Sequence, residues 1–120
     1  MSRVYVSGSI RDMPRCRAVM DIVRQAGHTI TYDWTEYDGS KDNFNEARRQ
    51  YNGVGSADVL ILVEHPRLKA GWMEFGVAVS LAIPTLVIPH PEVSPSMWYT
   101  FPNVNVIGNH TIPDAISLVA

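Results

Sequence analysis

Cysteine, long apolar runs and runs of basic residues are scarce in this chain, and each absence excludes a class of protein or partner. Its 120 residues include one cysteine, Cys16, which excludes an internal disulfide and fits a reducing, cytoplasmic setting. No apolar run reaches the ~18 residues of a membrane span, and no signal-peptide segment follows Arg3. The formal net charge is −2, without a basic run. We therefore expect neither a membrane nor a nucleic acid as partner, since nucleic-acid binding usually leaves a basic footprint.

Motifs for metals, dinucleotides and nucleophilic triads are also missing. The segment 53–55, Gly-Val-Gly, precedes an expected strand, which is the wrong order for a dinucleotide fingerprint. No Ser-His-Asp or Cys-His arrangement is readable. The histidines are scattered without metal-ligand spacing: His28, His65, His90 and His110. We expect no metal.

The length and an apolar fraction of 46% predict one domain, residues 1–120, with a real core. Short apolar strands alternate with helical segments along it. Strands are expected at 4–7, 28–32, 59–63, 85–88 and 104–107. Helices are expected from Pro14 to a stop at Gly27, at 43–51, from 71 to about 82, and at 113–118.

This alternation predicts an α/β fold, a five-stranded parallel sheet with helices on both faces. The expected architecture is a flavodoxin-like (Rossmann-like) three-layer sandwich with strand order 2-1-3-4-5. Ligands in such folds bind beyond the carboxyl ends of the strands, at the switch point between the first and third strands. The loops 7–13, 33–38 and 64–74 are expected to meet there.

The first of these loops has residues suited to a phosphate group. Gly8 permits close approach of the backbone, while Ser7 and Ser9 supply hydroxyls and Arg11 a planar guanidinium. A helix beginning near Pro14 would add the positive end of its dipole. A plain turn with a solvated Arg11 is an equally good interpretation of so short a motif.

A single carboxylate, Glu74, is expected in the first turn of the helix that begins at Gly71. Its neighbours Trp72, Met73 and Phe75 are apolar. A glutamate there can simply complement the helix dipole. Its setting, on the segment after the third strand, favours a reactive group, because a carboxylate can act as nucleophile at a glycosidic carbon.

Other candidates have two interpretations each. Asp58 begins the third strand, so it lies away from the expected site and could serve only a turn or a backbone bond. Trp34 and Tyr37 follow the second strand, where they could stack on a base or pack at the edge of the core. The aromatic cluster in 98–101, near three prolines, is expected to form a dimer contact or a lid.

Three segments resemble the nucleoside 2-deoxyribosyltransferase superfamily. They are Val4-Tyr5-Val6-Ser7-Gly8-Ser9-Ile10-Arg11, Ala57-Asp58-Val59 and Met73-Glu74-Phe75-Gly76-Val77-Ala78. The Gly-Ser-Ile-Arg loop is similar, more narrowly, to that of the 2'-deoxynucleoside 5'-monophosphate N-glycosidases. The resemblance extends from residue 4 to about 90. It implies a flavodoxin-like fold, sites completed by a dimer, and no cofactor.

The resemblance also implies residue roles. Glu74 would attack the anomeric carbon, Tyr5 would position it, and Asp58 would assist the leaving base. The 7–11 loop would hold the 5'-phosphate, with Ser96 of a neighbouring subunit in contact with it. The predicted catalytic residues are thus Glu74, Tyr5 and Asp58, and the predicted substrate-binding residues are Ser7, Gly8, Ser9, Ile10, Arg11, Trp34, Gly71 and Ser96.

The chain departs from this pattern just before Glu74. Many transferases carry an acid where Leu68, Lys69 and Ala70 stand, which weakens base exchange and leaves protonation of the base unexplained. Arg67 and Lys69 could contact phosphate, but we expect them to be solvated.

Our leading hypothesis is hydrolysis of the N-glycosidic bond of (deoxy)nucleoside 5'-monophosphates by a homodimer or higher homo-oligomer, releasing free base and sugar 5-phosphate. One alternative is a nucleoside 2-deoxyribosyltransferase that exchanges bases. Another is a non-catalytic nucleotide-binding or signalling module. Cleavage of NAD is a more remote alternative, by fold analogy alone.

Overall fold

A computed structural model describes residues 1–39, 42–108 and 111–120, and places five parallel strands in one sheet of order β2-β1-β3-β4-β5. The strands are β1 (Arg3–Ser7), β2 (Thr29–Ile30), β3 (Val59–Val63), β4 (Thr85–Ile88) and β5 (Val104–Val106). All of β3 is buried, as expected for a central strand covered on both faces. The predicted flavodoxin-like architecture and strand order are confirmed.

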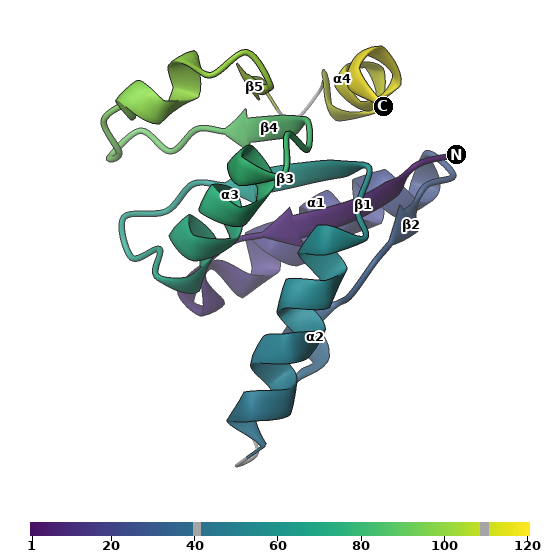
Figure 1. The fold of residues 1–120 in the computed structure, drawn as a ribbon, viewed down its shortest axis with the longest axis vertical. Helices are drawn as coiled ribbons and strands as arrows, with labels where there is room; N and C mark the ends of the chain where they lie inside the picture. Colours follow the sequence, from purple (N-terminus) through teal and green to yellow (C-terminus); the bar gives the residue numbers. More distant parts are fainter. Residues whose placement is uncertain (40–41, 109–110) are drawn as a thin grey trace.

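Helices cover both faces of this sheet (Figure 1). They are α1 (Met13–Gln25), α2 (Asn43–Gly55), α3 (Ala70–Ser80) and α4 (Ile112–Val119). The first and last pack together on one face, and α2 packs with α3 on the other. Short 3-10 helices of the described residues lie in the connections: η1 (Ile10–Asp12), η2 (Trp34–Glu36) and η3 (Met97–Thr100).

Helix α1 ends at Gln25, two residues before Gly27, the residue that was predicted to stop it. This glycine has a positive φ of 89°, and its N–H donates to the carbonyl of Arg24. The N–H of His28 donates to the carbonyl of Val23. These two bonds form a Schellman motif, which satisfies carbonyls at the helix end and turns the chain toward β2.

Two predicted boundaries are wrong for local reasons. The second strand was expected over 28–32, but β2 has only two residues, because Asp33 accepts a bond from the Thr35 N–H and starts η2. The helix expected over 43–51, with its stop at Gly53 and Gly55, continues through Gly53 to Gly55. A Cβ at Gly53 would lie 3.0 Å from the ring of Tyr5, so this glycine allows α2 to pack closely on β1.

The helix that carries Glu74 also begins earlier than predicted. It starts at Ala70, so Glu74 is its fifth residue and lies beyond the first turn, where the dipole acts most strongly. Gly71 is buried, and a Cβ there would lie 2.5 Å from Leu68 and 3.3 Å from the Ser7 hydroxyl. The missing side chain therefore lets the start of α3 approach the carboxyl end of β1.

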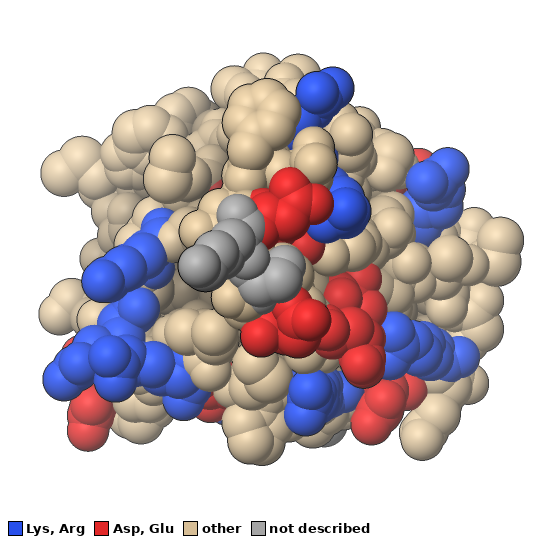
Figure 2. All heavy atoms as spheres, turned by 90° about the horizontal axis from the view of Figure 1, so that it is seen from below, with Lys and Arg blue, Asp and Glu red and all other residues tan. Residues whose placement is uncertain are grey.

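The surface carries charges of both signs. On the face that Figure 2 shows, acidic side chains gather near the middle, and most lysine and arginine side chains lie around them. No helix in the described part of the chain is long and apolar enough to cross a membrane.

Candidate active site

Two hydroxyls from β1 hold the carboxylate of Glu74. The Tyr5 hydroxyl donates to Glu74 Oε2 at 2.5 Å, and the Ser7 hydroxyl donates to Oε1 at 2.7 Å. Tyr5 and Ser7 are two residues apart on one strand, so their side chains point to the same face of the sheet, the face covered by α3. The structure thus brings three predicted site residues into direct contact.

Burial raises the pKa of Glu74 above its ordinary value, although the bonds from Tyr5 and Ser7 oppose this shift. The negative charge of Glu46, on α2, raises it further. Burial and the neighbouring Glu74 also raise the pKa of Tyr5, so its hydroxyl keeps its proton and remains a donor. The carboxylate is therefore poorly solvated but fixed in orientation, a state suited to a nucleophile.

Glu74 faces a cavity of about 360 Å³ lined mostly by the three loops that the fold was expected to bring together. Its volume lies within the range typical of small-molecule sites. The lining residues are Gly8, Ser9, Ile10, Arg11, Met13, Trp34, Tyr37, Gly39, Gln50, Arg67, Lys69, Ala70 and Glu74. The prediction that these loops converge on one pocket is consistent with this lining.

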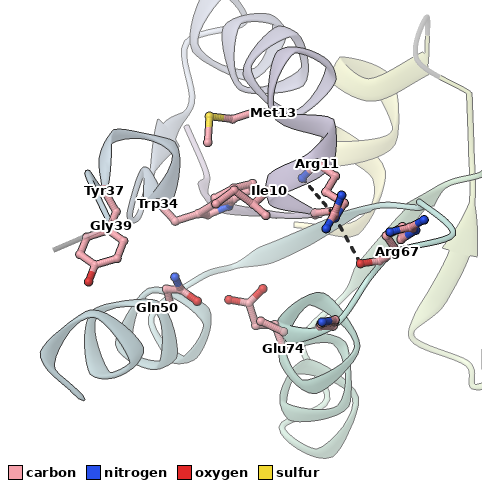
Figure 3. Close-up of a pocket in the computed structure, with 13 residues that line it drawn as sticks. Ile10, Arg11, Met13, Trp34, Tyr37, Gly39, Gln50, Arg67 and Glu74 are labelled. Atoms are coloured by element: carbon pink, nitrogen blue, oxygen red, sulfur yellow. Dashed lines mark hydrogen bonds between the residues drawn. The ribbon is translucent and has the colours of Figure 1, made fainter. Parts of the chain in front are cut away.

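The pocket has two chemically different sides, with Glu74 between them (Figure 3). Trp34 and Tyr37 lie on one side, and Arg11 and Arg67 lie on the other. Such an arrangement offers an aromatic surface for a planar group and a cationic surface for an anion, with a carboxylate in the middle.

Among the residues that the structure describes, none forms an ion pair with the cations of this side. Arg11, Arg67 and Lys69 line the pocket, and none of them forms an ion pair with another described residue. By contrast, Arg15 and Arg24 pair with nearby aspartates. Unpaired cations that gather in one pocket provide a positive potential for an anionic ligand. The expectation that Arg67 and Lys69 are merely solvated is incomplete, because both are exposed and also border the pocket.

The loop after β1 is shaped by Gly8 and Ser9. A Cβ at Gly8 would lie 2.4 Å from the sulfur of Cys16, so only glycine lets the loop lie against α1. The Ser9 hydroxyl accepts a bond from the Arg11 N–H at 3.1 Å, and it donates to the Arg67 carbonyl at 3.5 Å (Figure 3). Ser9 thus connects the two loops that carry the pocket arginines.

On the aromatic side, Trp34 is fixed by its own hydrogen bond. Its indole N–H donates to the carbonyl of Val6 at 2.7 Å, and the residue is 8% exposed. Ile10, on the opposite loop, is 73% exposed although it lines the pocket. An apolar side chain exposed in the same pocket as an anchored indole is a surface that a planar ligand would cover.

Asp58 does not reach this pocket. Its carboxylate accepts the Arg3 N–H at 2.8 Å, at the amino end of β1. Ser7 and the pocket lie at the other end of that strand, about 13 Å away at the usual rise per residue. Because parallel strands place their starts at one edge of the sheet, Asp58 lies at the edge opposite the pocket, where its carboxylate accepts a backbone bond. Its assignment to the leaving base stays a prediction.

Gly71 and Ser96 lie outside the lining of the Glu74 pocket. Gly71 contributes close packing instead. The Ser96 hydroxyl accepts the Trp98 N–H at 3.1 Å, and Ser96 lines a second, smaller hollow with Trp72, Phe75, Gly76 and Trp98. Any contact of Ser96 with phosphate would have to come from another subunit.

Sequence reasoning missed Gln50, which enters the pocket from α2. Glu46 is one turn earlier and is 4% exposed, and Gly53 and Val54 on the same helix are buried. The spacing of 46, 50, 53 and 54 marks one helix face, so two polar residues on that inward face were the available signal. No group of three potential metal ligands occurs among the described residues, and His110 lies outside them.

The fold is shared with solved structures at low sequence identity. The CMP N-glycosidase BcmB from Clostridium botulinum superposes with a TM-score of 0.65 at 14% identity, over 97% of both chains. A conserved protein from Enterococcus faecalis superposes with a TM-score of 0.68 at 14% identity, over 98% of both chains. No protein-family model matches the chain, and neither does any curated protein sequence. At these identities the similarity establishes the fold, one that also occurs in a nucleotide N-glycosidase.

Proposed function

We propose that this protein hydrolyses the N-glycosidic bond of nucleoside 5'-monophosphates, with Glu74 as nucleophile. One observation carries the proposal: the buried Glu74 carboxylate, held by Tyr5 and Ser7, lies between an aromatic side and a cationic side of one pocket. A nucleotide has the same order of parts, with its base and its 5'-phosphate on opposite sides of the sugar. The shared fold with a CMP N-glycosidase supports the proposal.

In the first step, a carboxylate oxygen of Glu74 forms a bond to C1' as the bond from C1' to the base nitrogen breaks. The base leaves with the electron pair of that bond and takes a proton from water. Tyr5 and Ser7 fix the carboxylate, so little rotational freedom is lost on the way to the transition state. In the second step, water attacks C1' as the bond from C1' to Glu74 breaks, and it loses a proton to the hydroxide left by the first step, which gives the sugar 5-phosphate.

The phosphate would bind at the cationic side. Arg11 offers a planar pair of donors suited to phosphate oxygens, and Arg67 and Lys69 add positive charge. The Ser7 hydroxyl is occupied by Glu74, so phosphate contacts from this loop fall to Arg11, Ser9 and the backbone around Gly8. Trp34 would carry the base, with Ile10 covering the sugar or base from the other loop.

A homo-oligomer is part of the proposal. Apolar side chains are exposed around η3, where Met97 is 82% and Trp98 49% exposed. Ser96 lies in the same segment, so a second copy packed there would bring its Ser96 toward the neighbouring site. Sedimentation equilibrium of the wild type and of Trp98→Asp measures this association directly.

Release of free base from nucleoside 5'-monophosphates tests the reaction. We expect the wild type to release base, and Glu74→Ala and Glu74→Gln to release none while remaining folded. A set of monophosphates with matching nucleosides distinguishes a phosphate-dependent enzyme from a nucleoside enzyme. If an added acceptor base yields exchanged nucleoside, the protein is a 2-deoxyribosyltransferase. If nucleotides bind without any turnover, and Glu74→Ala binds them equally well, the protein is a binding module.

A further inference from the structure

Gln50 is held in one orientation by a buried acid. Its Nε2 donates to Glu46 Oε2 at 2.9 Å, and Glu46 is 4% exposed. The other carboxylate oxygen of Glu46 accepts the Tyr32 hydroxyl at 2.5 Å and lies 3.6 Å from the Arg49 guanidinium. Three donors thus surround Glu46, which therefore acts as an acceptor. A rotation of the Gln50 amide by 180° would bring two oxygens together, so this arrangement disfavours it.

On the side of the pocket formed by Gln50 and Glu74, most of the polar atoms available to a ligand are therefore hydrogen-bond acceptors. With Nε2 directed at Glu46, the Gln50 carbonyl oxygen is left for the pocket that Gln50 lines. Glu74, which faces Gln50 across the pocket (Figure 3), is a second acceptor. The hydroxyls of Tyr5 and Ser7 both donate to Glu74, so their hydrogens are not available to a ligand.

From this geometry we propose that Gln50 is a specificity residue that selects bases carrying an exocyclic amine, and that Glu46 is the positioning residue that fixes it. The inference rests on the proposed function. An exocyclic amine offers N–H donors and no in-plane lone pair, so it can donate a hydrogen bond to the Gln50 carbonyl oxygen. A carbonyl at the same position would face another oxygen without a donor between them. Cytosine and adenine nucleotides are therefore preferred over uracil and hypoxanthine nucleotides.

Equilibrium binding tests the inference separately from turnover. In Glu74→Gln protein, which cannot cleave by the proposed route and keeps a side-chain oxygen for the Tyr5 hydroxyl, dissociation constants are measured for CMP, UMP, AMP and IMP by titration calorimetry. We expect each amino nucleotide to bind about fivefold or more tightly than its oxo partner, the effect of one hydrogen bond. In the same background, Gln50→Met removes the amide at similar volume and should bring the ratio close to one.

Glu46→Gln provides the second variant. It keeps an acceptor for Tyr32 but can also donate to Gln50, so it permits the reversed amide and should lower the amino-to-oxo ratio. Asn52→Ala, an exposed position on the same helix, is the control and should keep the ratio. Circular dichroism verifies that each variant is folded.

The outcomes separate the two proposals. Equal or tighter binding of the oxo nucleotides, or a ratio unchanged by both Gln50→Met and Glu46→Gln, would overturn the role of Gln50. Binding with the expected ratio, together with a wild type that releases no base, would overturn the glycosidase and leave the base selection standing. Failure of all four nucleotides to bind would overturn both.

Discussion

The hydroxyl of Tyr5 lies 2.5 Å from Glu74 Oε2, across the space between β1 and α3. A second tyrosine–glutamate pair lies outside the pocket: the Tyr99 hydroxyl donates to Glu64 Oε2, and the same carboxylate accepts the His90 N–H. Burial raises the pKa of both tyrosines. Since Tyr32 also donates to Glu46, similar bonds occur at three carboxylates, of which only Glu74 lines the pocket. The Tyr99–Glu64 pair, away from Gln50, supplies a matched control.

Replacing Tyr5 with phenylalanine should slow cleavage. A hydrogen bond to a charged group contributes about 1.5–3 kcal/mol, so we expect kcat to fall roughly ten- to one-hundred-fold with a smaller change in KM. The bond orients Glu74, and its loss would allow the carboxylate to leave the position for attack on C1'. Steady-state kinetics of Tyr5→Phe with the best nucleotide substrate measures the effect.

Tyr99→Phe is the control for that experiment. It removes the same type of bond from Glu64, which anchors the segment around His90 rather than lining the pocket. Its kcat should stay within about twofold of wild type, even if its melting temperature falls. Equal losses of kcat in the two variants would argue that Tyr5 acts through stability and not through Glu74.

The pH dependence of kcat should have an acid limb above the ordinary glutamate pKa of about 4.3. Burial raises the pKa of Glu74, and a nucleophile must be ionised, so activity is lost as the pH falls through that raised value. Tyr5→Phe should move the limb to still higher pH, because the Tyr5 bond lowers the pKa of Glu74. Initial rates at saturating nucleotide measure this pH dependence. A kcat that continues to increase as the pH is lowered below ~4 would exclude an ionised Glu74 nucleophile.

The arrangement of the sheet could be predicted from the sequence because the signals were strong and local. The apolar runs of β3 and β4 were predicted with their observed bounds, and right-handed crossovers leave few orders for alternating strands and helices. The extent of β2 was not predictable in this way. Its two residues pair with Arg3 and Val4 of β1, and the cap at Asp33 determines where the chain turns away.

The site was partly predictable because parallel strands bring their following loops to one edge. That rule placed the loops of Arg11, Trp34 and Glu74 together. It did not find Gln50, since α2 comes before a strand and reaches the pocket only through its packing against α3. It also placed Asp58 correctly: a residue at the start of a strand lies at the edge opposite the pocket, whatever family pattern it matches.

Arg11→Ala should affect nucleotides far more than nucleosides. If Arg11 binds the 5'-phosphate, its loss raises KM for monophosphates by about tenfold or more, since a hydrogen bond between charged groups contributes about 1.5–3 kcal/mol. KM for a matching nucleoside should hardly change. Arg48→Ala is the control, because Arg48 is exposed on α2 and stacks over Phe44 away from the pocket lining. Equal increases of KM for nucleotide and nucleoside would contradict the assignment of Arg11 to the 5'-phosphate.

Asp58→Ala should separate structure from catalysis. The carboxylate accepts one exposed backbone N–H at the amino edge of the sheet, so we expect the free energy of unfolding to fall by about 0.5–1.5 kcal/mol. Base release per folded molecule should be unchanged. Urea unfolding and initial rates on the same preparation give both quantities. A kcat reduced tenfold or more at full folding would restore a catalytic role for Asp58.

Glu74→Gln should abolish base release and yet stabilise the protein at neutral pH. Because burial raises the pKa of Glu74 in the folded state, the folded protein holds this proton more tightly than the unfolded chain. Stability from this group is therefore present below the unfolded pKa and is lost as the pH rises through the folded one. The amide avoids that loss, since its oxygen can accept from Tyr5 and its nitrogen can donate to the Ser7 hydroxyl.

The melting temperature of Glu74→Gln should exceed that of wild type at pH 7, with a difference that shrinks toward pH 4. Glu92→Gln, at an exposed carboxylate, should show no such difference, and a Glu74→Gln protein less stable than wild type at pH 7 would contradict a buried, costly charge.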